Sequence, residues 1–105
     1  MGVQHLRDHL PILTFTAIGD AYGACFEYAP MDVIRSRNTL KGYFPHHKYA
    51  IGCGRYTDDT QMSVAVSETL IKFGGAASVC SLAESFVKAF KRDERQAIRA
   101  DFVIC

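Results

Sequence analysis

The chain has 105 residues, which is enough for one small folded domain but not for two. Its 12 Lys and Arg side chains nearly balance its 11 Asp and Glu side chains, and a net charge of +1 argues against a surface that binds nucleic acid or an acidic membrane. With 49% hydrophobic and 22% charged residues, the composition is that of a globular chain and not of a disordered one.

The apolar stretch near the N-terminus is too short to cross a membrane, since a spanning helix needs about 20 apolar residues. Pro11 and Asp20 also interrupt it, which disfavours a signal peptide. We therefore expect a soluble, cytoplasmic protein with neither a membrane nor nucleic acid as a partner.

A first helix is predicted from about Asp8 to Tyr28. Asp8 can cap this helix, and Pro11 falls in its first turn, where proline costs little. Most positions are apolar, so the helix should be buried on most sides. Gly19 and Gly23 lie on one face, and each lowers helix stability by about 1 kcal/mol relative to alanine. We expect another backbone or a ligand to approach closely there.

Residues 30–56 form a long connection that contains one short predicted helix, from Met31 to about Ser36. Ordered loops of this length are usually functional. The segment is aromatic and weakly basic, which suits stacking on a ring or binding of phosphate, although its composition alone favours an ordinary surface loop. Its adjacent histidines, His46 and His47, are interpreted as exposed polar side chains.

The cysteines and the remaining histidines do not indicate a zinc site or a disulfide framework. The four cysteines, at positions 25, 53, 80 and 105, contain no CxxC pair, and small secreted scaffolds are usually richer in cysteine. His5 and His9 could share a helix face but lack a paired cysteine motif. We expect free, buried thiols and exposed histidines.

Two further helices are predicted. From Asp58 to Phe73, apolar residues at positions 62, 66, 70 and 73 form the stripe of a core-facing helix, and two glycines end it. The next helix begins at Ser81, where Ser81 and Glu84 have the spacing of a capping box, and it runs to at least Arg92. No convincing strand appears, so the predicted fold class is all-α.

Two adjacent carboxylates, Asp58 and Asp59, stand between Thr57 and Thr60 at the start of a predicted helix. They can complement the positive end of the helix while Thr57 caps it. Adjacent carboxylates also repel each other, and a bound Mg²⁺, which takes oxygen ligands, would relieve that repulsion. The spacing alone leaves capping and metal binding open.

Asp20 and Glu27 could add to this acidic group. On an unbroken helix these residues, seven apart, lie on nearly the same side and about 10 Å apart along the axis. Such a face could hold a cation or a sugar hydroxyl. The alternative is that Glu27 lies in solvent and Asp20 caps a neighbouring element.

Two blocks of the sequence, in this order, resemble the N-terminal signatures of the ADP-ribosylglycohydrolase family: GDAYGACFE at residues 19–27 and GRYTDDTQM at residues 54–62. The resembling region spans roughly Leu13 to Arg92. The resemblance implies an all-α fold and a site for a pair of Mg²⁺ or Mn²⁺ ions. It implies that Thr57, Asp58 and Asp59 are metal ligands, that Glu27 is the catalytic residue or places the substrate near the scissile bond, and that Asp20 is structural.

The resemblance also implies a reaction and a partner. The reaction is hydrolysis that removes ADP-ribose from a modified side chain or a related conjugate, and the partner is the ADP-ribosylated protein or that conjugate. Carboxylates near the anomeric carbon would stabilise an oxocarbenium-like transition state, while the metal binds ribose hydroxyls and orients water. The loop from Lys41 to Gly54 would then edge the pocket.

This sequence departs from the family in one respect. Family members are much longer, and a second acidic cluster of the form DxDT completes their metal site, whereas no such cluster occurs here. We therefore expect residues 1–105 to form a partial, truncated domain that is weakly active or inactive alone and could self-associate through exposed apolar surface. The alternative is a non-catalytic all-α binding or assembly module derived from the same fold.

Overall fold

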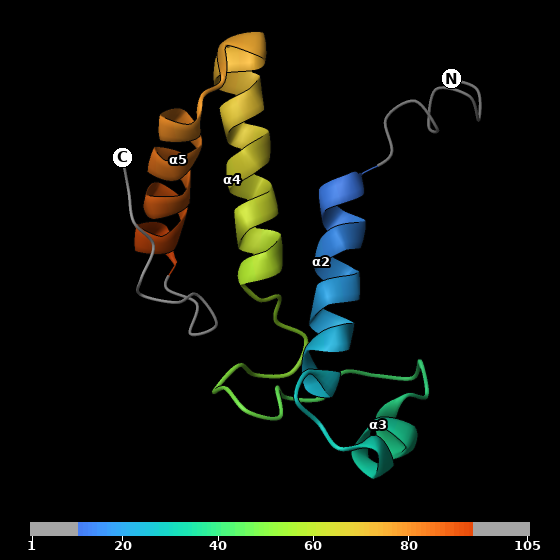
Figure 1. The fold of residues 1–105 in the computed structure, drawn as a ribbon. Helices are drawn as coiled ribbons and strands as arrows, with labels where there is room; N and C mark the ends of the chain where they lie inside the picture. The colour runs from blue at the N-terminus through green and yellow to red at the C-terminus, as the bar shows by residue number, and fades with distance from the viewer. Residues whose placement is uncertain (1–10, 94–105) are drawn as a thin grey trace, which may run out of the picture.

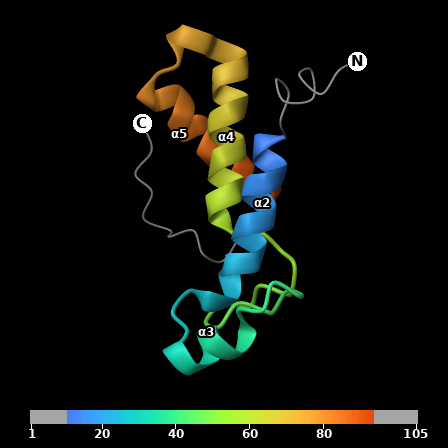
Figure 2. The ribbon, with the colours of Figure 1, turned by 90° about the vertical axis from the view of Figure 1, so that its right-hand side faces the viewer.

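The computed structural model describes residues 11–93, which are helical and contain no strand. Its α-helices are α2 (Ile12–Gly23), α3 (Met31–Arg37), α4 (Asp58–Phe73) and α5 (Val79–Arg92). One 3₁₀ turn, η1 (Ala24–Phe26), follows α2 and another, η2 (Gly74–Ala76), follows α4. Helix α4 contacts α2 and α5, while α3 and the long connection lie beyond the end of α2 (Figure 1). Viewed from the side, α5 crosses α4 at an angle (Figure 2). The predicted all-α class is confirmed.

Helix α2 is shorter than predicted. It begins after Pro11, and the expected cap, Asp8, lies outside the described residues. The α-helix ends at Gly23 and the 3₁₀ turn at Phe26. The predicted continuation to Tyr28 is wrong because Tyr28 has a φ of +59°, which belongs to the left-handed region and cannot continue a right-handed helix.

The surroundings of α2 also differ from the prediction. Ile12, Phe15 and Ile18 are exposed, so in the described part of the chain the helix is not buried on most sides. No atom of the described residues lies within 4 Å of where a Cβ would stand on Gly19 or Gly23. The close approach expected at these glycines is therefore absent from residues 11–93.

Helix α4 has the predicted bounds, but a different face packs against its neighbours. Its buried residues are Thr60, Gln61, Ala65 and Thr69. In the predicted apolar stripe, by contrast, Leu70 is 54% and Phe73 is 40% exposed. The stripe prediction is wrong because α4 meets α5 through small and polar residues: Ala65 is fully buried, and the hydroxyls of Thr69 and Ser85 lie 2.6 Å apart in a hydrogen bond.

Helix α5 begins two residues before the predicted start. Ser78 is its N-cap, and the capping box pairs Ser78 with Ser81 instead of Ser81 with Glu84. The Ser81 hydroxyl accepts from the Ser78 amide at 2.7 Å, so a short serine side chain fills the place expected for glutamate. At the other end of α5, the side-chain amide of Gln61 donates to the carbonyl oxygens of Ala89 and Asp93.

One carboxylate joins α2 to the beginning of α4. Asp20 accepts from the Thr57 amide at 2.8 Å and from the Thr57 hydroxyl at 2.7 Å. It also accepts from the amide and the hydroxyl of Thr60, at 3.2 and 2.7 Å. These donors satisfy an ionised carboxylate, and the positive end of the α4 dipole stabilises its charge further. Asp20 therefore caps a neighbouring helix, which was one of the two interpretations of its sequence position.

Replacing Asp20 should weaken the fold. Asp20→Ala leaves buried donors of Thr57 and Thr60 without an acceptor, so we expect the free energy of unfolding to fall by about 3 kcal/mol. Urea denaturation followed by far-UV circular dichroism measures this change. Asp32→Ala is the matched control, because Asp32 lies exposed in the first turn of α3 and should change stability by at most about 0.5 kcal/mol. Equal unfolding midpoints for both variants would contradict the assigned role.

Candidate functional site

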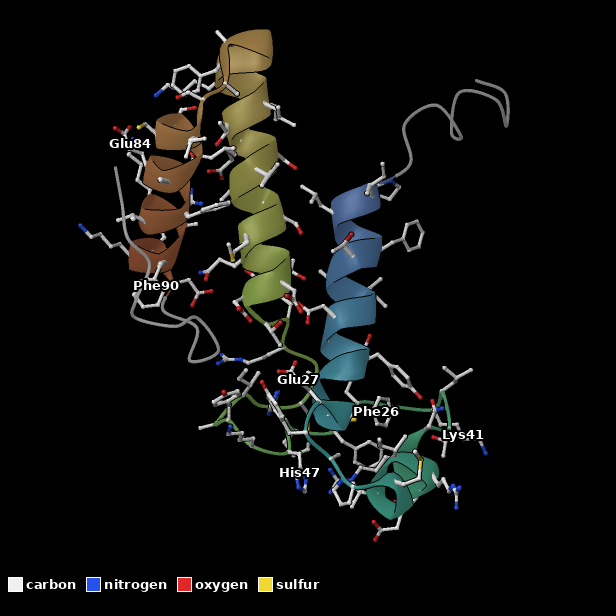
Figure 3. The ribbon with its side chains drawn as sticks, viewed as in Figure 1. Phe26, Glu27, Lys41, His47, Glu84 and Phe90 are labelled. Carbon is white, nitrogen blue, oxygen red and sulfur yellow. The ribbon has the colours of Figure 1, made fainter. Side chains whose placement is uncertain are left out.

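Acidic residues gather where α2 ends and α4 begins. Asp58 and Asp59 form the first turn of α4, Asp20 lies in the last turns of α2, and Glu27 follows η1. Figure 3 shows Glu27 at the end of α2 and η1 that lies nearest the start of α4. Glu27 and Asp59 are exposed, and Asp58 is half-buried. The fold thus brings together the acidic residues of both sequence blocks.

The carboxylates influence one another electrostatically. Partial burial raises the pKa of Asp59, and the negative charges of Asp58, Asp20 and Glu27 raise it further. Asp20 has its four donors, whereas in the described part of the chain the carboxylates of Glu27, Asp58 and Asp59 make no hydrogen bond or ion pair. Three carboxylates are therefore free to bind a ligand.

Thr57 takes part in capping. Its buried hydroxyl donates to Asp20 and accepts from the Asp59 amide at 3.3 Å. The capping interpretation of Thr57 is thus confirmed. Within residues 11–93, no three His, Cys, Asp or Glu side chains are grouped closely enough to hold a metal ion. The assignment of Thr57, Asp58 and Asp59 as metal ligands remains a prediction, as does the catalytic role of Glu27.

Glu27 lies in a β-turn and not on an unbroken helix with Asp20, which corrects the earlier expectation. The Ala29 amide donates to the Phe26 carbonyl oxygen at 3.1 Å and closes the turn. Glu27 has φ −64° and ψ 127°, and Tyr28 has φ +59°, as in a type II turn. Glycine or asparagine usually fills the Tyr28 position, because a left-handed conformation costs other residues about 1–2 kcal/mol.

The long connection is ordered around His46, a residue whose role the sequence analysis missed. His46 is only 6% exposed, which contradicts the predicted exposure, whereas His47 is exposed as predicted. The Nδ1 atom of His46 accepts from the amides of Lys48 and Tyr49, at 3.0 and 2.9 Å. The local signal was weak: a polar side chain can accept from the backbone amides two and three residues after it and so form a turn, but nothing in the sequence singles out His46 for this role.

As predicted, Cys25, Cys53 and Cys80, the cysteines of the described residues, form no disulfide with one another. Cys25 is buried, but Cys53 and Cys80 are exposed, so the predicted burial holds for one of these three. Cys105, His5 and His9 lie outside the described residues. In the part of the chain that the structure describes, no helix has the length and apolar character needed to span a membrane.

Comparison with known proteins identifies the family. Residues 12–102 match the sequence profile of the family named ADP-ribosylglycohydrolase, and this range contains both acidic blocks. No curated protein and no solved structure matched the chain. Because the matched region covers most of the 105 residues and its acidic blocks meet in the fold, the chain belongs to the ADP-ribosylglycohydrolase family.

Proposed function

We propose that this chain acts in the hydrolytic release of ADP-ribose from a modified side chain or a related conjugate, with a divalent metal ion as cofactor. The observation that carries the proposal is that Asp59 lies near enough to Asp58 and Glu27 for their charges to raise its pKa, while none of these three carboxylates has a partner among the described residues. Family membership supports the reaction class.

Asp58, Asp59 and Thr57 are the residues that would hold Mg²⁺ or Mn²⁺, since both ions prefer oxygen ligands. The proton of the Thr57 hydroxyl is directed to Asp20, which leaves an oxygen lone pair for a cation. A bound metal would supply binding of ribose hydroxyls and orientation of water. Because residues 11–93 hold no complete ligand group, we propose that acidic ligands from elsewhere complete the site and that these residues alone bind the ion weakly.

Glu27 would act at the scissile bond. Its exposed position at a turn allows its carboxylate to approach the anomeric carbon of a bound ribose. A carboxylate there stabilises the positive charge that develops in an oxocarbenium-like transition state.

A non-catalytic assembly module remains the second candidate, and one observation favours it. Large apolar side chains are exposed on α2, α4 and the start of α5, including Phe15, Ile71 and Val79. Exposed apolar surface of this kind often marks contact with another protein or with a second copy of the chain.

Metal binding can be measured by calorimetric titration with Mn²⁺. We expect a dissociation constant of about 1 mM for the unmodified chain, typical of weak oxygen-ligand sites. Asp58→Asn and Asp59→Asn should each weaken binding about tenfold or more, because each removes a charged ligand. Asp32→Asn is the control, since Asp32 is the second residue of α3 as Asp59 is the second residue of α4. If all four proteins give the same trace, the proposed ligands are wrong.

The pH dependence of stability tests the repulsion among the carboxylates. The pKa of Asp59 is higher in the folded chain than its ordinary value, so the folded state holds this proton more tightly. Ionised Asp59 therefore destabilises the fold at neutral pH, and this cost disappears as the pH falls through the folded pKa. Asp59→Asn should raise the melting temperature at pH 7, and its free energy of unfolding should exceed that of the parent by at most about 0.5 kcal/mol. This difference should vanish in acid. A variant less stable than the parent at pH 7 would show that capping dominates.

Catalysis can be tested by measuring ADP-ribose released from modified arginine or serine peptides in the presence of Mg²⁺. We expect slow release that falls about 100-fold in Glu27→Gln, since the variant loses the negative charge beside the reacting carbon. Glu84→Gln should behave as the parent, because Glu84 lies on α5 well away from Glu27 (Figure 3). Absence of release by the unmodified chain would instead favour the assembly module.

A further inference from the structure

The turn that carries Glu27 has a backbone conformation that its own sequence does not favour. With Glu and Tyr at its central positions, a type I turn would be the ordinary choice, because it places both residues at negative φ. Tyr28 instead has φ +59°, so the peptide between Glu27 and Tyr28 is turned over relative to type I. Contacts from outside the turn must select this conformation.

Those contacts come from residues 46–51, here called the His46 loop. The ring of Tyr28 lies 6.4 Å from the ring of His46 and 6.2 Å, edge to face, from the ring of Tyr49. The Lys48 ammonium lies 4.6 Å from the centre of the Tyr28 ring, a cation–π contact. Three residues of one loop therefore contact the ring of the residue that follows Glu27, although 63% of Tyr28 remains exposed.

The imidazole of His46 sets the shape of this loop. Because its Nδ1 atom accepts two backbone amides, Nδ1 carries no proton, and the loop chain wraps around the ring. The His46 amide donates to the Ile51 carbonyl oxygen at 3.0 Å and closes the loop. The His46 ring also lies 5.0 Å from the ring of Tyr49. Removing the Nδ1 acceptor would free the segment that carries Lys48 and Tyr49.

We propose that His46 is a positioning residue: it folds the His46 loop into a clamp on the Tyr28 ring, and this clamp holds the turn that presents Glu27. The value of the clamp for catalysis rests on the proposed function, but its existence does not. His46 would act on Glu27 only through Tyr28.

Nuclear magnetic resonance can detect the turn type directly. In a type II turn the ψ of Glu27 brings its Hα close to the Tyr28 amide proton, whereas a type I turn moves the two apart. We expect a strong Overhauser contact between these protons in the parent chain. His46→Phe keeps a ring but loses the acceptor, and it should lose most of this contact. His46→Asn places an acceptor oxygen where Nδ1 lies and should retain it.

His47→Phe is the matched control, because it makes the same change at the exposed neighbour of His46. Tyr28→Leu provides a second test that leaves His46 in place, and it should lose the contact while the far-UV circular dichroism stays that of the parent. Persistence of the contact in folded His46→Phe or Tyr28→Leu would overturn the proposal. A parent chain that releases no ADP-ribose would refute catalysis and leave this result standing.

Discussion

The carboxylate of Asp20 is the interaction on which the arrangement of the acidic residues depends. It accepts hydrogen bonds from Thr57 and Thr60, and it thereby fixes the start of α4 against α2. The two threonines are three residues apart, so they face the same side of the chain, toward Asp20. Asp58 and Asp59 lie between them in sequence. The two sequence blocks of the family thus have a physical connection, since the aspartate of the first satisfies the donors of the second.

The same interaction divides the carboxylates into two kinds. Asp20 accepts hydrogen bonds from the protein itself, while Glu27, Asp58 and Asp59 have no such partners in the described part of the chain. Gathering these charges costs the fold some stability, as the raised pKa of Asp59 indicates. If these carboxylates served only to hold the fold together, only carboxylates with protein donors, such as Asp20, would be needed.

The bounds of α4 could be predicted from local sequence signals, whereas its buried face and the end of α2 depend on residues far away in the sequence. The bounds of α4 follow from Thr57 and Gly74, and the capping role of Asp20 was one of two interpretations. The buried face of α4 was missed because Ala65 and Thr69 are selected by the close approach of α5, not by hydrophobicity. The end of α2 was missed because the left-handed Tyr28 contacts residues about 20 positions away.

Gln61, which follows Thr60, gives α4 a second attachment, through its hydrogen bonds to the carbonyl groups of Ala89 in α5 and of Asp93, the C-cap of α5. The acidic pair therefore sits between two fixed points, one on each side. The entropy of closing a loop grows only with the logarithm of its length, so residues 38–45 can lengthen or shorten among relatives without displacing the pair. A single residue inserted between Thr57 and Gln61 would instead rotate one attachment by about 100° relative to the other. Evolutionary variation in chain length should thus be tolerated in residues 38–45 and forbidden within these five residues.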